Sequence, residues 1–372
     1  MPTQSQSQSS GNDLQIVPTK RTSYHGHFDC FSGAAGDMLL SSCLDASGNP
    51  DELEKHVTKC INSGIPELAG EFEIRTKKVW RGGGSIAGLH VTVLSKYHNE
   101  PAPVPKRRTV DDGRTKEEDD THHHHHHHSH EHEHVLKHSS HQHNVCEYDT
   151  SHDHIHDHER SSHSHNHSNS SSSTNTKGPL RNLGDIRTFL ENASDKFIDP
   201  WVKTLAIATF TELAHAEATT HGADSIESVH FHEVGAIDSI VDTVGTLIAL
   251  HYLNVKSFSV SRIPMGEGSV YTDHGILPVP APATLRLLIG MPTCPGPLGV
   301  VTGELVTPTG AALLRTLTLK YPKGINTIKS STTQCRPPNF TIRKIGIGAG
   351  TKDFEKHPNI LRLLLGDDVV IK

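Results

Sequence analysis

The chain has 372 residues and a formal net charge of −7, and hydrophobic residues make up only 34% of it. This length predicts two domains or one domain with a large insertion, and the low apolar share predicts that part of the chain adds nothing to a core. The acidic balance identifies no partner, because the 32 histidines, each roughly a quarter protonated at pH 7, add about +8. No basic patch with interleaved aromatic residues indicates nucleic acid, and no apolar run is long enough to span a bilayer.

The six cysteines are widely scattered and form no C-x-x-C pair, which disfavours a zinc knuckle and a disulfide framework. They predict reduced thiols in an intracellular protein. Residues 1–23 are polar, predict a disordered tail and lack the apolar core of a secretory signal. We expect a cytoplasmic protein. Import into an organelle has little support, because Asp13 precedes the first basic residue, Lys20, where a transit peptide should be rich in arginine.

The predicted elements begin with a strand over residues 24–31, a small-residue turn over 32–37 and a helix over 38–46. Such a turn leaves backbone N–H groups unpaired at a helix start, where they suit an anion. The alternative is a tight strand-to-helix connection with Asp37 as the helix cap, and the spacing alone favours it. Residues 51–63 then predict an amphipathic helix, and residues 71–80 and 86–94 predict a hairpin.

Residues 98–177 differ from the rest of the chain in composition and predict a disordered insertion within a loop. The insertion holds 20 histidines between positions 122 and 167, with few apolar residues to offset the entropy of ordering. Histidine-rich tracts bind metals, so this one predicts a store or loading arm for Ni²⁺ or Zn²⁺. The alternative is a tolerated polar linker that binds metal incidentally. The candidate ligands are His122, His123, His124, His125, His126, His127, His128, His130, His132 and His134.

Beyond the insertion, helices are predicted over residues 185–191 and 201–217, and a third continues from segment 230–242 to about residue 253. In that segment Asp238 and Asp242 are one helical turn apart and share a helix face. Imidazole and carboxylate are ligands for borderline divalent metals. The alternative is a surface strand that leads into a capped helix. The candidate metal ligands here are His230, His232, Glu233 and Asp242.

The last third of the chain predicts strands over residues 258–262, 340–347 and 359–365 and helices over 283–289 and 311–316. His274 lies in a glycine-flanked turn and is either a ligand or proton carrier or a simple turn residue. The hydroxyls of Thr307 and Thr309 suit a phosphate or carboxylate, unless one of them is only the helix cap and Pro308 the first helical residue. Residues 348–353 predict a turn that could approach an anion.

These elements predict a mixed α and β core, with a mixed sheet and packed helices, formed by residues 24–97 and 178–366. The disordered insertion at 98–177 interrupts it. Five blocks of the chain resemble, in content and order, the LarC family of nickel insertion proteins. They are residues 28–38, 230–242, 275–284, 304–312 and 346–353.

The resemblance implies a nickel chelatase of the lyase class. Such proteins insert Ni²⁺ into pyridinium-3,5-bisthiocarboxylic acid mononucleotide with CTP hydrolysis, assisted by Mg²⁺ or Mn²⁺, to make the nickel-pincer cofactor of lactate racemase. It implies as partners this precursor, a racemase or epimerase apoprotein and a second copy of the chain. Family members continue past residue 365 into a C-terminal domain that carries nucleotide binding, and we expect that domain to be absent here.

The resemblance divides the candidate site residues into metal ligands, catalytic residues and cofactor-binding residues. The metal ligands are given above. The alternative functions are a nickel or zinc storage protein or metallochaperone that acts through the histidine tract, and a metal-dependent phosphohydrolase. The candidate catalytic residues are Asp29, Asp37, Glu233, Asp238 and His274, and the candidate cofactor-binding residues are Ser32, Gly33, Gly36, Thr307, Thr309 and Gly310.

Overall fold

The computed structural model describes residues 23–97 and 181–367, except 228, 230, 232–235, 273–274, 298, 300, 321–336 and 338. The predicted tail and the histidine-rich insertion therefore lie almost wholly outside the described residues. Four further candidate site residues lie outside them too: His230, His232, Glu233 and His274.

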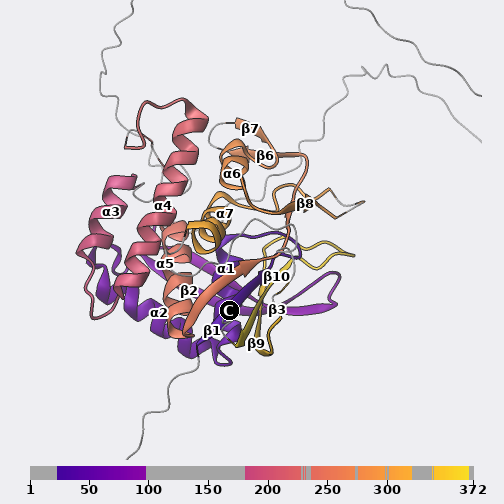
Figure 1. Ribbon diagram of the computed structural model, residues 1–372, viewed down its shortest axis with the longest axis horizontal. Helices are drawn as coiled ribbons and strands as arrows, with labels where there is room; N and C mark the ends of the chain where they lie inside the picture. The colour runs from indigo at the N-terminus through magenta and orange to yellow at the C-terminus, as the bar shows by residue number, and fades with distance from the viewer. Residues whose placement is uncertain are drawn as a thin grey trace, which may run out of the picture. The chain divides into compact units, whose positions relative to one another are not determined.

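A six-stranded mixed sheet forms the centre of the fold, in the order β2-β3-β9-β10-β1-β4 (Figure 1). β1 pairs in parallel with β4, and β3 meets β9 in parallel at a single residue pair, whereas the other neighbours are antiparallel. Both ends of the described chain thus lie in adjacent central strands, and the predicted fold class is confirmed. The strands are β1 (Tyr24–Asp29), β2 (Phe72–Arg81), β3 (Ile86–Ser95), β4 (Val255–Val260), β9 (Ile342–Ala349) and β10 (Ile360–Asp367).

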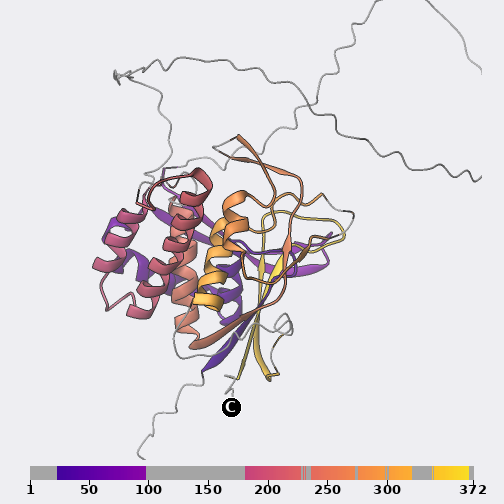
Figure 2. The ribbon, with the colours of Figure 1, turned by 45° about the horizontal axis from the view of Figure 1, so that its top comes forward.

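The helices form layers beside the sheet. α1 packs on β3, β9 and β10, α5 packs on α1, and α4 lies on α5 with α3 outermost (Figures 1 and 2). α6 and α7 pack on α4 beside the site described below. The helices are α1 (Gly36–Ala46), α2 (Pro50–Gly64), η1 (Pro66–Leu68), α3 (Leu183–Asn192), α4 (Pro200–His221), α5 (Ile237–Tyr252), α6 (Pro282–Leu287), α7 (Pro308–Arg315) and η2 (Thr316–Lys320).

Two glycines of β9 allow α1 to lie directly on the sheet. A Cβ at Gly346 would come within 1.8 Å of the carbonyl oxygen of Ser42, and one at Gly348 within 2.0 Å of that of Met38. Real side chains cannot make such contacts, so any larger residue at either position would push the helix off the sheet. This close packing fixes the N-terminal turn of α1, and hence Asp37, relative to the sheet.

The structure corrects three sequence-based expectations at element ends. β9 runs to Ala349, so Gly348 lies in a strand and not in the predicted anion-approaching turn. α7 begins at Pro308 and not at residue 311, which confirms the alternative in which Thr307 is the helix cap and Pro308 the first helical residue. Asp37 is not the cap of α1, because Ala35 occupies that position and Asp37 lies in the first turn.

Two small sheets, which the sequence did not predict, lie outside the central one. β5 (Ile263–Met265) pairs in parallel with β8 (Thr293–Pro295), and β6 (Ser269–Thr272) forms a hairpin with β7 (Gly275–Pro278). The hairpin lies above α6 in Figure 1. None of the helices in the described ranges is long and apolar enough to cross a bilayer.

The face of the sheet opposite α1 carries a buried cluster of histidine and serine side chains. His25 bonds through its two ring nitrogens to the hydroxyls of Ser257 and Ser259, each at 2.8 Å. His27 Nδ1 also lies 2.8 Å from Ser259 Oγ, while its Nε2 is buried without a partner among the described residues. Burial, the largest cause, lowers the pKa of His27 from 6.5 to about 4.

Candidate functional site

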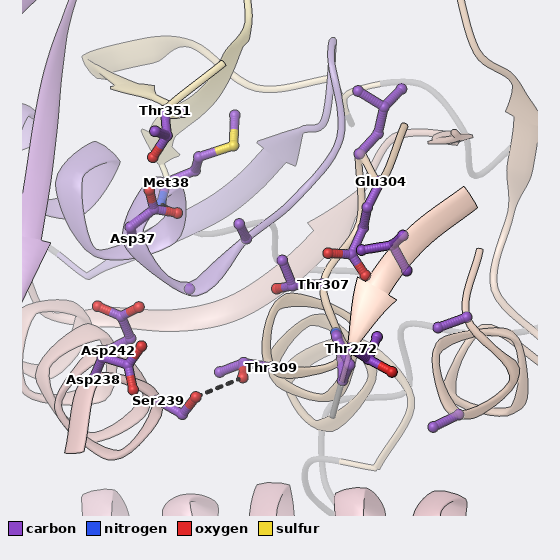
Figure 3. Close-up of a pocket in the computed structure, with 18 of the residues that line it drawn as sticks. Asp37, Met38, Asp238, Ser239, Asp242, Thr272, Glu304, Thr307, Thr309 and Thr351 are labelled. Atoms are coloured by element: carbon purple, nitrogen blue, oxygen red, sulfur yellow. Dashed lines mark hydrogen bonds between the residues drawn. The ribbon is translucent and has the colours of Figure 1, made fainter. Parts of the chain in front are cut away.

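A cavity of about 870 Å³ opens where the starts of α1, α5, α6 and α7 meet β3, the end of α4 and the β6–β7 hairpin. This volume is within the range of cavities that bind nucleotide-sized molecules. Figure 3 shows aspartates on one side of the cavity, Glu304 on the other, and Thr307 and Thr309 between them. The cavity therefore combines residues from both halves of the chain, on either side of the insertion.

Three aspartates gather on the wall formed by α1 and α5. Asp37 comes from the first turn of α1, and Asp238 and Asp242 come from successive turns of α5. Burial raises the pKa of Asp37 to about 6, a shift that His90 reduces and Asp238 increases. The pKa of Asp242 is raised well above its ordinary value by burial and then by Asp37 and Asp238. Carboxylates this close repel one another in a desolvated wall, and a bound cation would relieve that repulsion.

Gly36 brings α1 against Asp242. A Cβ at Gly36 would lie 2.7 Å from Asp242 Oδ2 and 2.8 Å from Asp242 Cβ, so no larger side chain fits between the two helices. Asp242 Oδ1 is buried and has no hydrogen-bond partner among the described residues. A buried carboxylate oxygen without a donor is costly, so this atom offers an unused acceptor to a cation.

His90 extends the acidic wall, and the sequence analysis missed it. Its Nδ1 lies 2.9 Å from the carbonyl oxygen of Ala349 and 3.9 Å from Asp37 Oδ2. Because a carbonyl only accepts, Nδ1 carries the hydrogen, which fixes the ring beside the Asp37 carboxylate. No local pattern around His90 could have identified it, since it is one of several polar residues on a predicted strand.

The two threonines at the start of α7 have different roles. Thr307 caps the helix, since the Gly310 N–H donates to its hydroxyl at 3.2 Å. Thr309 Oγ1 donates to Ser239 Oγ at 3.3 Å, which links α7 to the aspartate-bearing helix α5 (Figure 3). Thr307, Thr309 and Gly36 line the cavity.

Three other candidate cofactor-binding residues make contacts inside the fold and do not face the cavity. Ser32 is buried and donates a 2.7 Å hydrogen bond to the carbonyl of Pro358. A Cβ at Gly33 would lie 2.0 Å from the carbonyl oxygen of Leu305, and one at Gly310 would lie 2.4 Å from a main-chain oxygen. These positions are shaped by close backbone packing, and they form no open phosphate cradle.

Asp29 forms an ion pair with Arg362 across the β1–β10 register. The Arg362 Nε lies 2.8 Å from Asp29 Oδ2, and the side chain of Asp29 is 20% exposed. Asp29 does not belong to the lining of the cavity that holds Asp37, Asp238 and Asp242.

Lys352 supplies the only ammonium or guanidinium group among the described residues of the cavity lining. Its Nζ donates to the carbonyl oxygens of Thr302 at 3.1 Å and Glu304 at 2.5 Å. Burial lowers the pKa of Lys352, while Glu304 raises it. Two of its three hydrogens are thus directed at the main chain.

The aspartates do not form a ready-made metal centre. Within the described ranges, no three side chains of His, Cys, Asp or Glu are grouped so that they could hold a metal ion. The acidic wall can therefore attract a cation, but its described side chains do not supply a complete set of ligands. In this it differs from a structural metal site, whose ligand set is closed.

Comparison with known proteins connects this chain to a family. The family model described as nickel insertion protein matches residues 27–371. A protein of Geobacter sp. (strain M21), named "Putative nickel insertion protein", is 46% identical over 189 residues, which are 51% of this chain and 44% of that protein. A protein of Nocardioides sp. (strain ATCC BAA-499 / JS614) is 44% identical over 186 residues, 50% of this chain and 42% of that protein. It is named pyridinium-3,5-bisthiocarboxylic acid mononucleotide nickel insertion protein.

The matched segments span less than half the length of these relatives. No solved structure matches the chain. The resemblance to the LarC family inferred from five separate blocks is confirmed by a match that extends over most of the chain. The protein belongs to the nickel insertion protein family.

Proposed function

We propose that the protein inserts Ni²⁺ into pyridinium-3,5-bisthiocarboxylic acid mononucleotide in the cavity bounded by α1, α5 and α7. Family membership gives nickel as the cargo, and the name of the Nocardioides relative gives the acceptor. In this proposal Asp37, Asp238 and Asp242 attract the cation in transit without coordinating it fully, and the cavity admits the mononucleotide.

The observation that carries the proposal is Asp242 Oδ1, which has no hydrogen-bond partner among the described residues and lies within a wall of three aspartates. Hard carboxylate oxygens bind Ni²⁺ less strongly than the sulfur ligands of the precursor do. Incomplete coordination by carboxylates therefore favours release of nickel to sulfur. A site with imidazole or thiolate ligands on every side would retain the metal.

Further ligands for the proposed site come from residues outside the described ranges. His230, His232 and Glu233 precede α5 by a few residues, and we propose that they complete the coordination of nickel that Asp242 begins. His274, which lies outside the described residues, is proposed as a proton carrier. The histidine tract, including His122–His128, is proposed to raise the local nickel concentration.

We include CTP dependence, with Mg²⁺ or Mn²⁺, on the family resemblance alone. Of the candidate cofactor-binding residues, Ser32, Gly33 and Gly310 are packed within the fold. Gly36, Thr307 and Thr309 line the cavity and are the ones proposed to contact the nucleotide. When bound, CTP would supply an activating phosphoryl or nucleotidyl group. The product is proposed to serve a lactate racemase-type enzyme in the cytoplasm.

The test is nickel transfer to purified precursor, with and without CTP, followed by the mass and absorbance of the product. We expect the parent chain to transfer nickel, and Asp238→Asn and His232→Ala to lose most of that activity. Glu67→Gln, an exposed change away from the cavity, is the matched control. If the parent chain forms no product either with or without CTP, the proposal is refuted.

Deletion of residues 99–177 separates insertion from storage. If the chain inserts nickel as proposed, the deletion variant should still transfer nickel at saturating metal and should lose activity only at limiting metal. A storage protein would lose all nickel binding with the tract. That result would also remove the aspartate wall from the proposed nickel path.

A further inference from the structure

Lys352 is held in place at both ends by the fold. It lies between β9 and β10, in the segment that the sequence predicts as a turn that could approach an anion. Its carbonyl oxygen accepts a 3.0 Å hydrogen bond from the side chain of Asn359, which is only 6% exposed. Its Nζ donates to the carbonyl oxygens of Thr302 at 3.1 Å and Glu304 at 2.5 Å. A ligand of Lys352 would therefore not have to order a long, flexible side chain.

The ammonium group of Lys352 has one hydrogen left for a ligand. A lysine carries three N–H donors, and two of them are directed at the carbonyl oxygens of Thr302 and Glu304. The third has no acceptor among the residues that the structure describes. A Cβ at Gly303 would lie 3.2 Å from Nζ, so the glycine leaves room for the ammonium group. Because Lys352 also lines the cavity, it offers a positioned cationic donor to a ligand there.

The two imidazoles of the described lining are already beside carboxylates. His90 Nδ1 lies 3.9 Å from Asp37 Oδ2, and His221 Nε2 lies 3.4 Å from Glu217 Oε2. Each imidazole therefore has an acidic neighbour within the cavity wall. Lys352, whose Nζ bonds only to main-chain oxygens among the described residues, is better placed to meet an anionic group.

The proposed acceptor has two chemically different ends. Its name specifies two thiocarboxylic acids on a pyridinium and the phosphate of a mononucleotide. Sulfur is the softer ligand and takes the nickel, so in the proposed function the sulfur end faces the aspartates. The Nζ of Lys352, bonded to the carbonyl oxygen of Glu304, lies on the opposite side of the cavity (Figure 3). The phosphate end is therefore the end that meets Lys352.

We infer that Lys352 binds the phosphate of the mononucleotide and thereby orients its sulfur atoms towards the aspartates. This inference rests on the proposed function, and it makes Lys352 a positioning residue. The acidic group that competes for the ammonium is Glu304, which raises the pKa of Lys352 against the larger, lowering effect of burial. A phosphate monoester carries up to two charges and three acceptor oxygens and so exceeds a single carboxylate in both respects.

The test compares the precursor with the nucleoside that a phosphatase makes from it, since the two differ only in the phosphate. Binding of each to the full chain is measured by equilibrium dialysis without nickel or CTP, and kcat/KM for nickel transfer to each is measured in parallel. The parent should prefer the mononucleotide about 10- to 100-fold, the effect of a charge-assisted hydrogen bond. Lys352→Met should lose this preference and should bind the nucleoside as the parent does.

The matched control is Lys356→Met, which removes the same charge from an exposed lysine of the same segment, outside the described lining of the cavity. It should keep the preference of the parent. Lys352→Gln, whose amide still offers two hydrogens to main-chain oxygens, replaces the methionine variant if circular dichroism shows that the latter does not fold. It should lose the preference in the same way.

A parent that treats the two ligands equally overturns the inference. So does a Lys352 variant that weakens both ligands by the same factor, because a lysine that only supports the surrounding fold would have that effect. Either result leaves the proposed function intact if the parent still inserts nickel. If neither ligand binds and no nickel is inserted, the proposed function is overturned, and the inference with it.

Discussion

The side chain of Asp242 occupies the space that a Cβ of Gly36 would need. The two positions lie on different helices and 206 residues apart in the chain, yet a Cβ at Gly36 would come within 2.7 Å of Asp242 Oδ2. The acidic wall therefore depends on a glycine at the first position of α1.

Gly36→Ala should disturb the site directly. The added methyl group overlaps the Asp242 carboxylate, so we expect a loss of stability of about 1–3 kcal/mol, as for other overpacked positions. Nickel insertion should fall much further than stability does, because Asp242 is displaced. Gly184→Ala, at a helical position with more room, is the control in thermal unfolding and nickel transfer. Unchanged transfer by Gly36→Ala would contradict the role of Asp242.

Asp37→Asn should stabilise the fold while it weakens function. The pKa of Asp37 is raised in the folded state from 3.8 to about 6 by burial, so its stabilising effect is complete below pH 3.8 and is lost as pH rises through about 6. The asparagine stays neutral and can still accept the hydrogen bond from the Met38 N–H. Its advantage at pH 7.5 should be about 1–3 kcal/mol, allowing for the 24% exposure of the Asp37 side chain.

Denaturant unfolding at pH 5 and pH 7.5 measures this effect, and the advantage should shrink at the lower pH. Nickel transfer by the same variant should fall about 10- to 100-fold, the usual cost of altering a metal environment. A variant that is less stable at pH 7.5 and fully active would argue against an electrostatically strained site.

His27 should make the fold sensitive to moderate acid. Its pKa is lowered in the folded state from 6.5 to about 4, mainly by burial. As pH falls from 6.5 towards 4, the unfolded chain gains a proton there that the folded chain does not bind. Stability should therefore decline by about 3 kcal/mol over this interval.

The comparison of unfolding curves at pH 7 and pH 4.5 should show this decline in the parent and a smaller one in His27→Leu. The variant loses the contact with Ser259 and so starts from lower stability. Ser259 retains His25 as a partner, which limits that loss. The same slope in both proteins would exclude His27 as the acid-sensitive group.

Asp29→Asn should affect stability more than nickel transfer. Asp29 pairs with Arg362, whose side chain is 46% exposed, and such partly exposed pairs contribute about 0–1 kcal/mol. We expect a shift in melting temperature of a few degrees at most and nickel transfer close to that of the parent. A collapse of transfer with an unchanged melting temperature would restore Asp29 as a catalytic candidate.

Much of the fold could be read from local sequence. Periodicity and capping residues predicted each strand of the large sheet and the helices against it within a few residues. Thr307 and Pro308 illustrate this, since a cap followed by proline marks a helix start whatever surrounds it. The shared helix face of Asp238 and Asp242 followed from their spacing alone.

The site itself depended on tertiary structure. Asp37 and His90 reach the aspartates of α5 only because α1 packs on β3 and β9, and no spacing in the chain encodes that contact. The same packing explains Gly346 and Gly348, both of which admit α1 to the sheet, although the sequence placed Gly348 in a turn that could approach an anion. Local sequence determined which elements form, because propensity and capping act over a few residues. Only long-range packing decided which polar side chains would meet in a desolvated cavity, where their charges interact.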